Sequence, residues 1–168
     1  MRVLVLLTVA AALQPGPLLR PSQTPGRFDS AAVVNPVVLP PTEGDPLWRM
    51  LYYGTSGAWA DPAAKPFLPT GACGLATSPD GVAWTRVDGE RADAAVFGPA
   101  DDLDAWDGLH VGVGDVVRAD DGESLVMFYL GGARATDGLP PGMPAGIRMR
   151  IGRATSADGG RTWTRDGA

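Results

Sequence analysis

The chain has 168 residues, of which 45% are hydrophobic and 20% are charged. These proportions are those of a globular protein and exclude a disordered, collagen-like or coiled-coil chain as the main class. The formal net charge is −5 and Lys65 is the only lysine, so no basic cluster can neutralise a phosphate backbone and we expect no nucleic-acid partner.

The N-terminal segment, residues 1–27, has the layout of a targeting segment. Arg2 is followed by an apolar run from Val3 to Leu13 and then by Pro15-Gly16-Pro17, the order found in a secretory signal peptide. The run is too short for a membrane-spanning helix, which needs about 20 residues. We therefore expect residues 1–27 to be a signal or targeting peptide and the protein to be secreted or lumenal, without a membrane span. Because no acidic residue precedes Asp29, transit to an organelle such as a plastid is the alternative.

The rest of the chain predicts β-strands. Residues 33–39 are a short β-branched stretch, and residues 48–54 are almost continuously apolar, as in a strand covered on both faces. The same two patterns return at residues 111–118 and 125–130. In residues 147–151 apolar side chains alternate with arginine, the period of a half-buried strand. Short final strands are expected to begin at Trp84 and Trp163, and no helical period follows residue 28.

These elements belong to two copies of one repeat. Gly74–Arg86, GLATSPDGVAWTR, matches Gly152–Arg165, GRATSADGGRTWTR, with one residue inserted in the second copy. Upstream, Met50 matches Met127, and Phe28-Asp29 matches Trp106-Asp107, at nearly the same separation along the chain. The common spacing predicts two units, residues 28–104 and residues 105–168.

Each copy contains a Ser-x-Asp-Gly turn before a tryptophan. The aspartates, Asp80 and Asp158, can accept hydrogen bonds from the backbone amides of their own turn, and the glycines can take positive φ. The second turn resembles the Asp-box of propellers such as sialidases, and the first is a shortened relative. We interpret Asp80 and Asp158 as structural turn residues and not as catalytic ones.

A four-stranded unit repeated with turns at fixed positions is typical of a β-propeller, in which neighbouring blades bury the sheet faces that one blade leaves open. The expected fold is therefore all-β, with two propeller blades. Because propellers have four to eight blades, we expect an N-terminal fragment of a longer protein.

The apolar first strand, the WRMLYYG second strand and the GLATSPDG turn together resemble the five-bladed propellers of the arabinanase, levansucrase and invertase glycoside hydrolases. The resemblance covers about residues 28–168. It implies five blades in the complete protein and carboxylates that converge on the propeller axis: an aspartate from the first blade, another from the second and a glutamate from the third. Glycoside hydrolysis needs such a pair of carboxyl groups beside the scissile bond.

Asp29 and Asp107 occupy equivalent places in the two repeats, each after an aromatic residue and before a first strand. The resemblance implies that Asp29 is the nucleophile or base and that Asp107 orients the substrate or tunes the acid. The alternative is that both are turn residues repeated for architectural reasons. The family's Asp-Pro dipeptide is matched here by Asn35-Pro36, and asparagine cannot act as a base, so Asp115 is a second candidate for the second-blade role.

Two further residues are candidates for substrate binding. His110 is the only histidine; it could hydrogen-bond a sugar, or be an ordinary polar residue. Trp59 lies in a loop, where an indole ring can stack on a sugar. Cys73 is the only cysteine, which excludes an intrachain disulfide and a cysteine-type zinc site, and we expect it in the core. The glycine-rich stretch at 112–114 lacks the lysine and helix of a phosphate loop, and the single histidine has no metal-ligand neighbours. We expect no cofactor and no metal.

Three functions follow as hypotheses. The first is a glycoside hydrolase-like propeller that acts on or binds a carbohydrate, enzymatic only when complete and inactive as the fragment alone. The second, favoured by Asn35 and by the missing third-blade glutamate, is a non-catalytic propeller that binds glycans or proteins. The third is a sialidase-like Asp-box propeller, and it is ranked last because no arginine begins a first strand to hold the substrate carboxylate.

Overall fold

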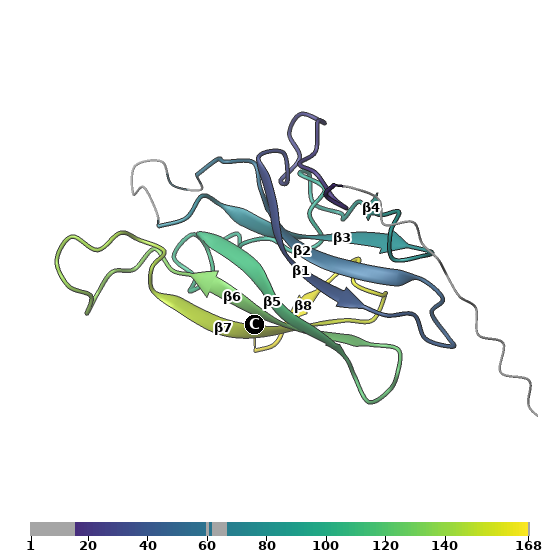
Figure 1. The fold of residues 1–168 in the computed structure, drawn as a ribbon. Coiled ribbons are helices and arrows are strands. Elements are labelled where there is room, and N and C mark those ends of the chain that lie inside the picture. Colours follow the sequence, from purple (N-terminus) through teal and green to yellow (C-terminus); the bar gives the residue numbers. More distant parts are fainter. Residues whose placement is uncertain (1–15, 60, 62–66, 168) are drawn as a thin grey trace, which may run out of the picture.

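The computed structural model describes residues 16–59, 61 and 67–167, and the apolar run of the expected leader lies outside them. The described chain forms two four-stranded antiparallel sheets and contains no helix, so the all-β prediction is confirmed (Figure 1). The first sheet has the order β1-β2-β3-β4 and the second β5-β6-β7-β8. The strands are β1 Ala32–Leu39, β2 Trp48–Thr55, β3 Gly71–Ser78, β4 Thr85–Val87, β5 His110–Arg118, β6 Leu125–Gly132, β7 Met149–Ser156 and β8 Thr164–Arg165.

The third strand of the second sheet differs from its predicted extent. The alternation of apolar residues and arginines predicts a strand over 147–151, whereas β7 runs over Met149–Ser156. The strand continues because its second half pairs with the apolar strand β6, from Tyr129↔Gly152 to Leu125↔Ser156. Cross-strand pairing therefore overrides the local alternation pattern.

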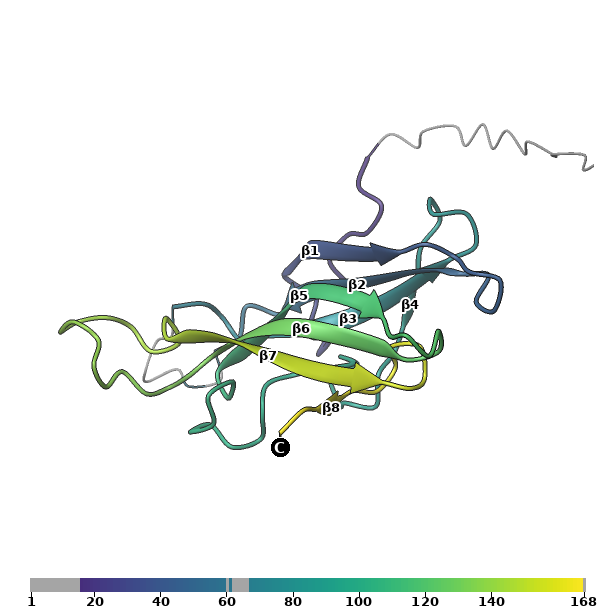
Figure 2. The same cartoon turned by 90° about the horizontal axis from the view of Figure 1, so that it is seen from below.

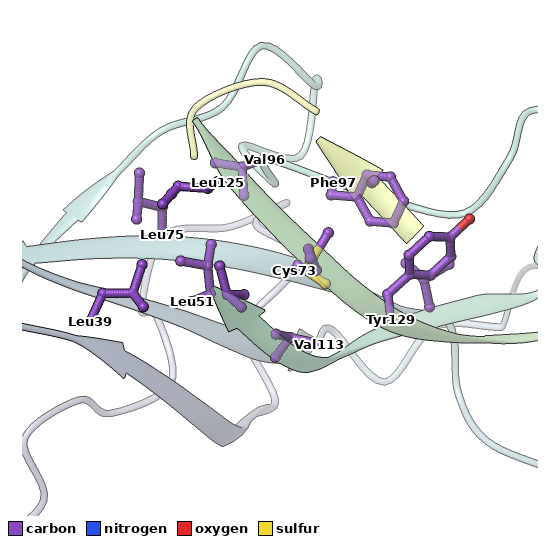
Figure 3. Packing of buried hydrophobic residues seen from close by; sticks show 13 residues of the cluster. Leu39, Leu51, Cys73, Leu75, Val96, Phe97, Val113, Leu125 and Tyr129 are labelled. Carbon is purple, nitrogen blue, oxygen red and sulfur yellow. The ribbon is translucent and has the colours of Figure 1, made fainter. Parts of the chain in front are cut away.

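The two sheets pack face to face, and β5 contacts β1, β2 and β3 of the first sheet (Figure 2). The layer between them is apolar: Leu51, Cys73 and Leu75 come from the first sheet, and Val113 and Tyr129 from the second (Figure 3). Burial of a leucine side chain of this kind contributes about 1.5–3 kcal/mol. Cys73 lies in this layer, as expected, and burial raises the pKa of its thiol to about 12.

Polar side chains link the two sheets at the end opposite the β2–β3 and β6–β7 loops. Arg49 donates to both carboxylate oxygens of Asp45, at 2.6 and 3.0 Å, and to the backbone oxygen of Gly159 in the turn between β7 and β8, at 2.9 Å. Arg118 of β5 donates to Asp45 at 3.3 Å and to the oxygen of Pro40 at 3.0 Å. Hydrogen bonds from Arg49 hold the pKa of Asp45 below its usual value against the effect of burial. This network fixes the position of one sheet along the other.

The structural repeat begins upstream of residue 28. The amide of Ser22 donates to the oxygen of Asp29 at 3.0 Å, and one repeat later the amide of Ala100 donates to the oxygen of Asp107 at 3.3 Å. Leu19 packs against the buried cluster of the first sheet that includes Met50 and Tyr52. Residues 19–27 thus contribute contacts to the first sheet, and a leader boundary at residue 27 stays a prediction.

A chain that begins at residue 28 should therefore be less stable than one that begins at residue 16. The shorter chain loses the packing of Leu19 and the backbone hydrogen bond of Ser22, and we expect its free energy of unfolding to fall by about 2–3 kcal/mol. Urea unfolding followed by tryptophan fluorescence measures the difference. Equal midpoints and slopes for the two chains would show that the segment contributes nothing.

Candidate functional site

Asp29 lies at the centre of a buried polar cluster in the first sheet. Its Oδ2 atom accepts a hydrogen bond from the Tyr52 hydroxyl at 2.9 Å and one from Nε of Arg86 at 2.7 Å, while Arg27 lies 3.3 Å from Oδ1. Burial alone would raise the pKa of Asp29, but the hydrogen bonds from Arg86 and Tyr52 outweigh it and keep this pKa below its usual value. Asp29 is therefore ionised, and Arg86 and Arg27 neutralise its negative charge.

Asp107 holds the matching place in the second sheet. Its Oδ2 atom accepts from the Tyr129 hydroxyl at 2.9 Å and from Nε of Arg165 at 2.8 Å. Arg165 also donates to the backbone oxygen of Gly98 at 2.6 Å and lies 4.3 Å from the ring centre of Phe97. Burial raises the pKa of Tyr129 to about 12, so its hydroxyl stays a donor.

The aromatic residue before each aspartate packs directly on glycine residues of the sheet, where a larger residue would not fit. A Cβ atom at Gly131 would lie 2.5 Å from the Cβ of Asp107, and one at Gly152 would lie 2.6 Å from the Trp106 ring. Trp106 in turn stacks on Tyr129, with ring centres 5.5 Å apart. The first sheet repeats the arrangement with Phe28, Tyr52, Gly54 and Gly74.

The two aspartates predicted to be catalytic belong to two separate polar clusters, one in each sheet. Asp29 and Asp107 are buried, each has its own tyrosine and arginine, and among the described residues they share no hydrogen-bond partner. A carboxylate neutralised by an arginine and removed from solvent cannot reach a sugar in this conformation. The placement favours the architectural alternative for both residues. Sequence reasoning missed Arg86 and Arg165 as their partners, although both arginines recur at the same place in the two copies, each two residues after the tryptophan of the turn.

Asp80 and Asp158 each hold a turn. Oδ1 of Asp80 accepts from the amides of Val82 and Ala83, both at 2.8 Å, and Oδ1 of Asp158 accepts from the amides of Arg161 and Thr162, both at 3.0 Å. The Thr162 hydroxyl adds a bond to Oδ2 of Asp158 at 2.6 Å, which the shortened first turn lacks. Burial acts to raise the pKa of Asp158, and the bonds from Thr162 and Ser156 lower it to about 2.

The first strands of both sheets carry a β-bulge at the same register. In β1, Asn35 and Pro36 lie between the pairs Val34↔Tyr53 and Val37↔Leu51. Asn35 and Pro36 are exposed, and Asn35 has a φ of 50°, a left-handed conformation that asparagine tolerates better than most residues.

In β5 the bulge lies between Val113↔Tyr129 and Asp115↔Phe128, so Asp115 holds the position that Val37 holds in β1. Asp115 is exposed, and its Oδ1 atom accepts from the amide of Val116 at 2.8 Å. Among the aspartates proposed for catalysis or binding, Asp115 is therefore the one whose carboxylate faces solvent from a first strand.

Trp59 lies at the end of the sheets where β1 and β5 begin. Its side chain is 40% exposed and borders a cavity of about 320 Å³. Polar residues of this cavity include Thr70, Arg91, Asp93 and Asp101. The loop that carries Trp59 also meets the β6–β7 loop, because the amide of Phe67 donates to the oxygen of Ala145 at 2.7 Å. An exposed indole beside polar groups is able to bind the apolar face of a sugar ring.

His110 begins β5 and is fully buried beside Gly132. Neither ring nitrogen has a hydrogen-bond partner among the described residues, and burial lowers the pKa of the imidazole. This placement favours the ordinary buried residue over a sugar ligand. Within the described part of the chain, no group of three or more His, Cys, Asp or Glu residues could hold a metal ion. No helix in that part could cross a membrane.

The sequence matches no protein-family model and no curated protein. Solved structures do match it. One, from work on the GH130 family of mannoside phosphorylases and its glycoside hydrolases that target β-1,2 mannosidic linkages in Candida mannan, has a TM-score of 0.52 and 22% identity over 83% of this chain. A glycosyl hydrolase from Bacteroides ovatus has a TM-score of 0.53 and 23% identity over 82%. A candidate glycosidase from Bacteroides thetaiotaomicron has a TM-score of 0.53 and 26% identity over 82%.

The two sheets are two blades of a β-propeller. The neighbours have five-bladed propellers, so the expected resemblance to five-bladed glycoside hydrolases is confirmed at the level of the fold. This chain spans about a third of their length, 32%, 32% and 33% respectively. We call the first sheet blade 1 and the second blade 2.

The close packing of Asp107 and Trp106 on Gly131 in blade 2 can be tested with Gly131→Ala. The added methyl group would overlap Asp107 and Trp106, and overpacking of this kind costs about 1–3 kcal/mol of unfolding free energy. Gly44→Ala is the matched control, because a Cβ atom there meets nothing within 4 Å. Thermal unfolding should show a lower midpoint for the Gly131 variant alone. Equal midpoints for both variants would rule out the close packing on Gly131.

The buried ion pair of Asp29 and Arg86 in blade 1 should make the stability of the chain depend on pH. We expect Asp29→Asn to lower the free energy of unfolding by about 2–3 kcal/mol at pH 7, because Arg86 and Tyr52 lose a charged partner. The pKa of Asp29 is depressed in the folded chain, while an unfolded aspartate titrates at about pH 3.9. The stabilisation is thus present above about pH 4 and is lost as the pH falls through the folded pKa. Denaturant unfolding at pH 7 and pH 3 should give a smaller difference at pH 3, and a constant difference would contradict the assignment.

Proposed function

We propose that the chain forms part of a carbohydrate-acting propeller that receives its ligand along the first strands of its blades. The supporting observation is the pair of bulges at one register in β1 and β5, which leave Asn35, Gly114 and Asp115 open to solvent. Bulges are frequent next to active sites, where they redirect side chains. The solved neighbours are glycoside hydrolase-like proteins, which is consistent with this class of ligand.

In this proposal each exposed group has a chemical role. The carboxylate of Asp115 accepts hydrogen bonds from sugar hydroxyls and orients the ring or serves as a base, and the amide of Asn35 both donates and accepts. Trp59 supplies a stacking surface at the end where these strands begin. The expected leader would send the protein out of the cytoplasm, and secretion is part of the same proposal.

A non-catalytic glycan-binding propeller is the second candidate, and one observation favours it. Hydrolysis needs two carboxyl groups, and β1 and β5 together contain one acidic residue, Asp115, with asparagine at the bulge of blade 1. Such a surface binds a sugar without cleaving it unless another carboxylate joins it.

Oligosaccharide binding by this chain tests the proposal. Isothermal titration against arabinan, xylan, fructan and β-1,2-mannan oligosaccharides should reveal binding of one class. We expect Asp115→Asn and Trp59→Ala to weaken it by about five- to fifty-fold, the loss of one charge-assisted hydrogen bond or one stacking contact. Asp120→Asn is the matched control, since Asp120 is an exposed aspartate in the turn after β5.

Release of reducing sugar from the same panel by the complete protein separates the two candidates, because the fragment alone is expected to be inactive in both cases. Binding with turnover supports the hydrolase, and binding without turnover supports the binding module. No binding of any oligosaccharide, or equal affinities of the Asp115, Trp59 and Asp120 variants, would overturn the placement of the site.

A further inference from the structure

The cavity of about 320 Å³ beside Trp59 is formed where the β2–β3 loop meets the segment between β4 and β5. Its described lining residues all fall between Gly26 and Gly108, so blade 1 and the segment that leads to blade 2 make its walls. None of these residues belongs to β1 or β5, and β3, which contributes Gly71 and Ala72, lies two places from β1 in the sheet. This space, which we call the Trp59 cavity, is therefore separate from the groups that the bulges expose.

The backbone is held on both sides of Trp59. One residue before it, the oxygen of Ala58 accepts a hydrogen bond from the amide of Thr70 at 2.9 Å. Two residues after it, Asp61 forms an ion pair with Arg134 of the β6–β7 loop at 3.1 Å. A stacking surface that is fixed before the ligand arrives loses less conformational freedom on binding.

The segment between β4 and β5 supplies the charged groups of the Trp59 cavity. Arg91 packs on Gly98, where a Cβ atom would lie 2.5 Å from its Cζ, and its Nε lies 3.6 Å from Oδ1 of Asp93. The same Oδ1 accepts from the amide of Ala95 at 3.2 Å. The side chains of Arg91 and Asp93 are 40% and 37% exposed, and Asp101, which is also exposed, lines the same cavity. One donor group and two acceptor groups are thus open to a ligand.

This combination of groups matches an uncharged sugar unit. A sugar hydroxyl both donates and accepts hydrogen bonds, so it can accept from Arg91 and donate to Asp93 or Asp101. The apolar face of the ring can stack on the indole of Trp59. A sugar with a carboxylate or sulfate group would instead bring negative charge beside two aspartates, and the arginine that could offset it is already paired with one of them.

We propose that the Trp59 cavity binds one uncharged sugar unit of the oligosaccharide and discriminates against acidic sugars. The inference rests on the proposed function for the class of ligand, and it adds a contact away from the first strands together with a charge preference. Pockets for small molecules have volumes of about 300–1,000 Å³. The Trp59 cavity is at the small end of this range, which suits a single ring.

Removal of the arginine tests whether the cavity takes part in binding. Isothermal titration with the neutral oligosaccharides of the panel should show an affinity at least about fivefold lower for Arg91→Gln, which loses one charge-assisted hydrogen bond. Arg161→Gln is the matched control, because Arg161 is an exposed arginine in the turn between β7 and β8, outside this cavity. Its affinity should equal that of the unaltered chain. Circular dichroism and the thermal midpoint check that both variants are folded.

The charge preference is tested with pairs of neutral and acidic ligands. Each oligosaccharide of the panel is compared with an acidic counterpart, in which primary hydroxyls are oxidised to carboxylates or, for xylan, a glucuronic acid branch is present. We expect the unaltered chain to bind the neutral member at least about threefold more tightly, because like charges repel. Asp101→Asn should reduce this ratio and Asp120→Asn should leave it unchanged. An acidic member that binds as tightly as the neutral one, or a ratio that Asp101→Asn does not alter, would overturn the charge preference.

The outcomes distinguish this inference from the proposed function. If Asp115→Asn weakens binding and Arg91→Gln does not, the Trp59 cavity is not part of the site and the proposed function stands. If Arg91→Gln weakens binding and Asp115→Asn does not, the cavity binds the sugar and the site along the first strands is overturned. A chain that binds no oligosaccharide overturns both.

Discussion

The packing of one apolar sheet face on another is the interaction on which the whole structure depends. A four-stranded sheet with continuously apolar strands has two faces to bury, and neither blade can cover its own. Leu51, Cys73 and Leu75 leave water only because β5 lies against the first sheet, with side chains of β6 such as Met127 in the same buried cluster. The arginine network around Asp45 adds position to this contact, since the apolar layer by itself would allow one sheet to slide along the other.

The buried aspartates show how a polar group can serve the same purpose inside a blade. Asp107 joins a tyrosine of β6 to an arginine of β8, and through Arg165 it reaches the segment that precedes the blade. The desolvation of the carboxylate is offset by two donors, one of them charged, which is the condition under which a buried charge is tolerated. The functional candidates are instead the groups that the bulges expose.

Much of the fold could be predicted because the repeat marks the strands twice. The spacing of Met50 and Met127 and of the two tryptophan turns located six of the eight strands to within a few residues, whereas β3 received no range of its own and β7 extends to Ser156 instead of ending at residue 151. The candidate site was harder. Asp29 and Asp107 recur in register, but recurrence is equally a property of packing residues, and only the positions of Arg86 and Arg165 after folding separate the two meanings. Asp115 could be suspected from the sequence, whereas the bulge that exposes it depends on pairing with β6.

In each blade a hydrogen bond from an arginine of the last strand reaches the segment before the first strand. In blade 2 it joins Arg165 to the carbonyl of Gly98. The arginine belongs to the outermost strand, while the carbonyl belongs to the segment that leads into the innermost one, and Arg86 makes the same connection to Arg20 in blade 1. The beginning and the end of a blade are thus tied within the blade itself. A unit closed in this way can be duplicated in a gene without any change to its interior, and only its two outer faces must suit a new neighbour.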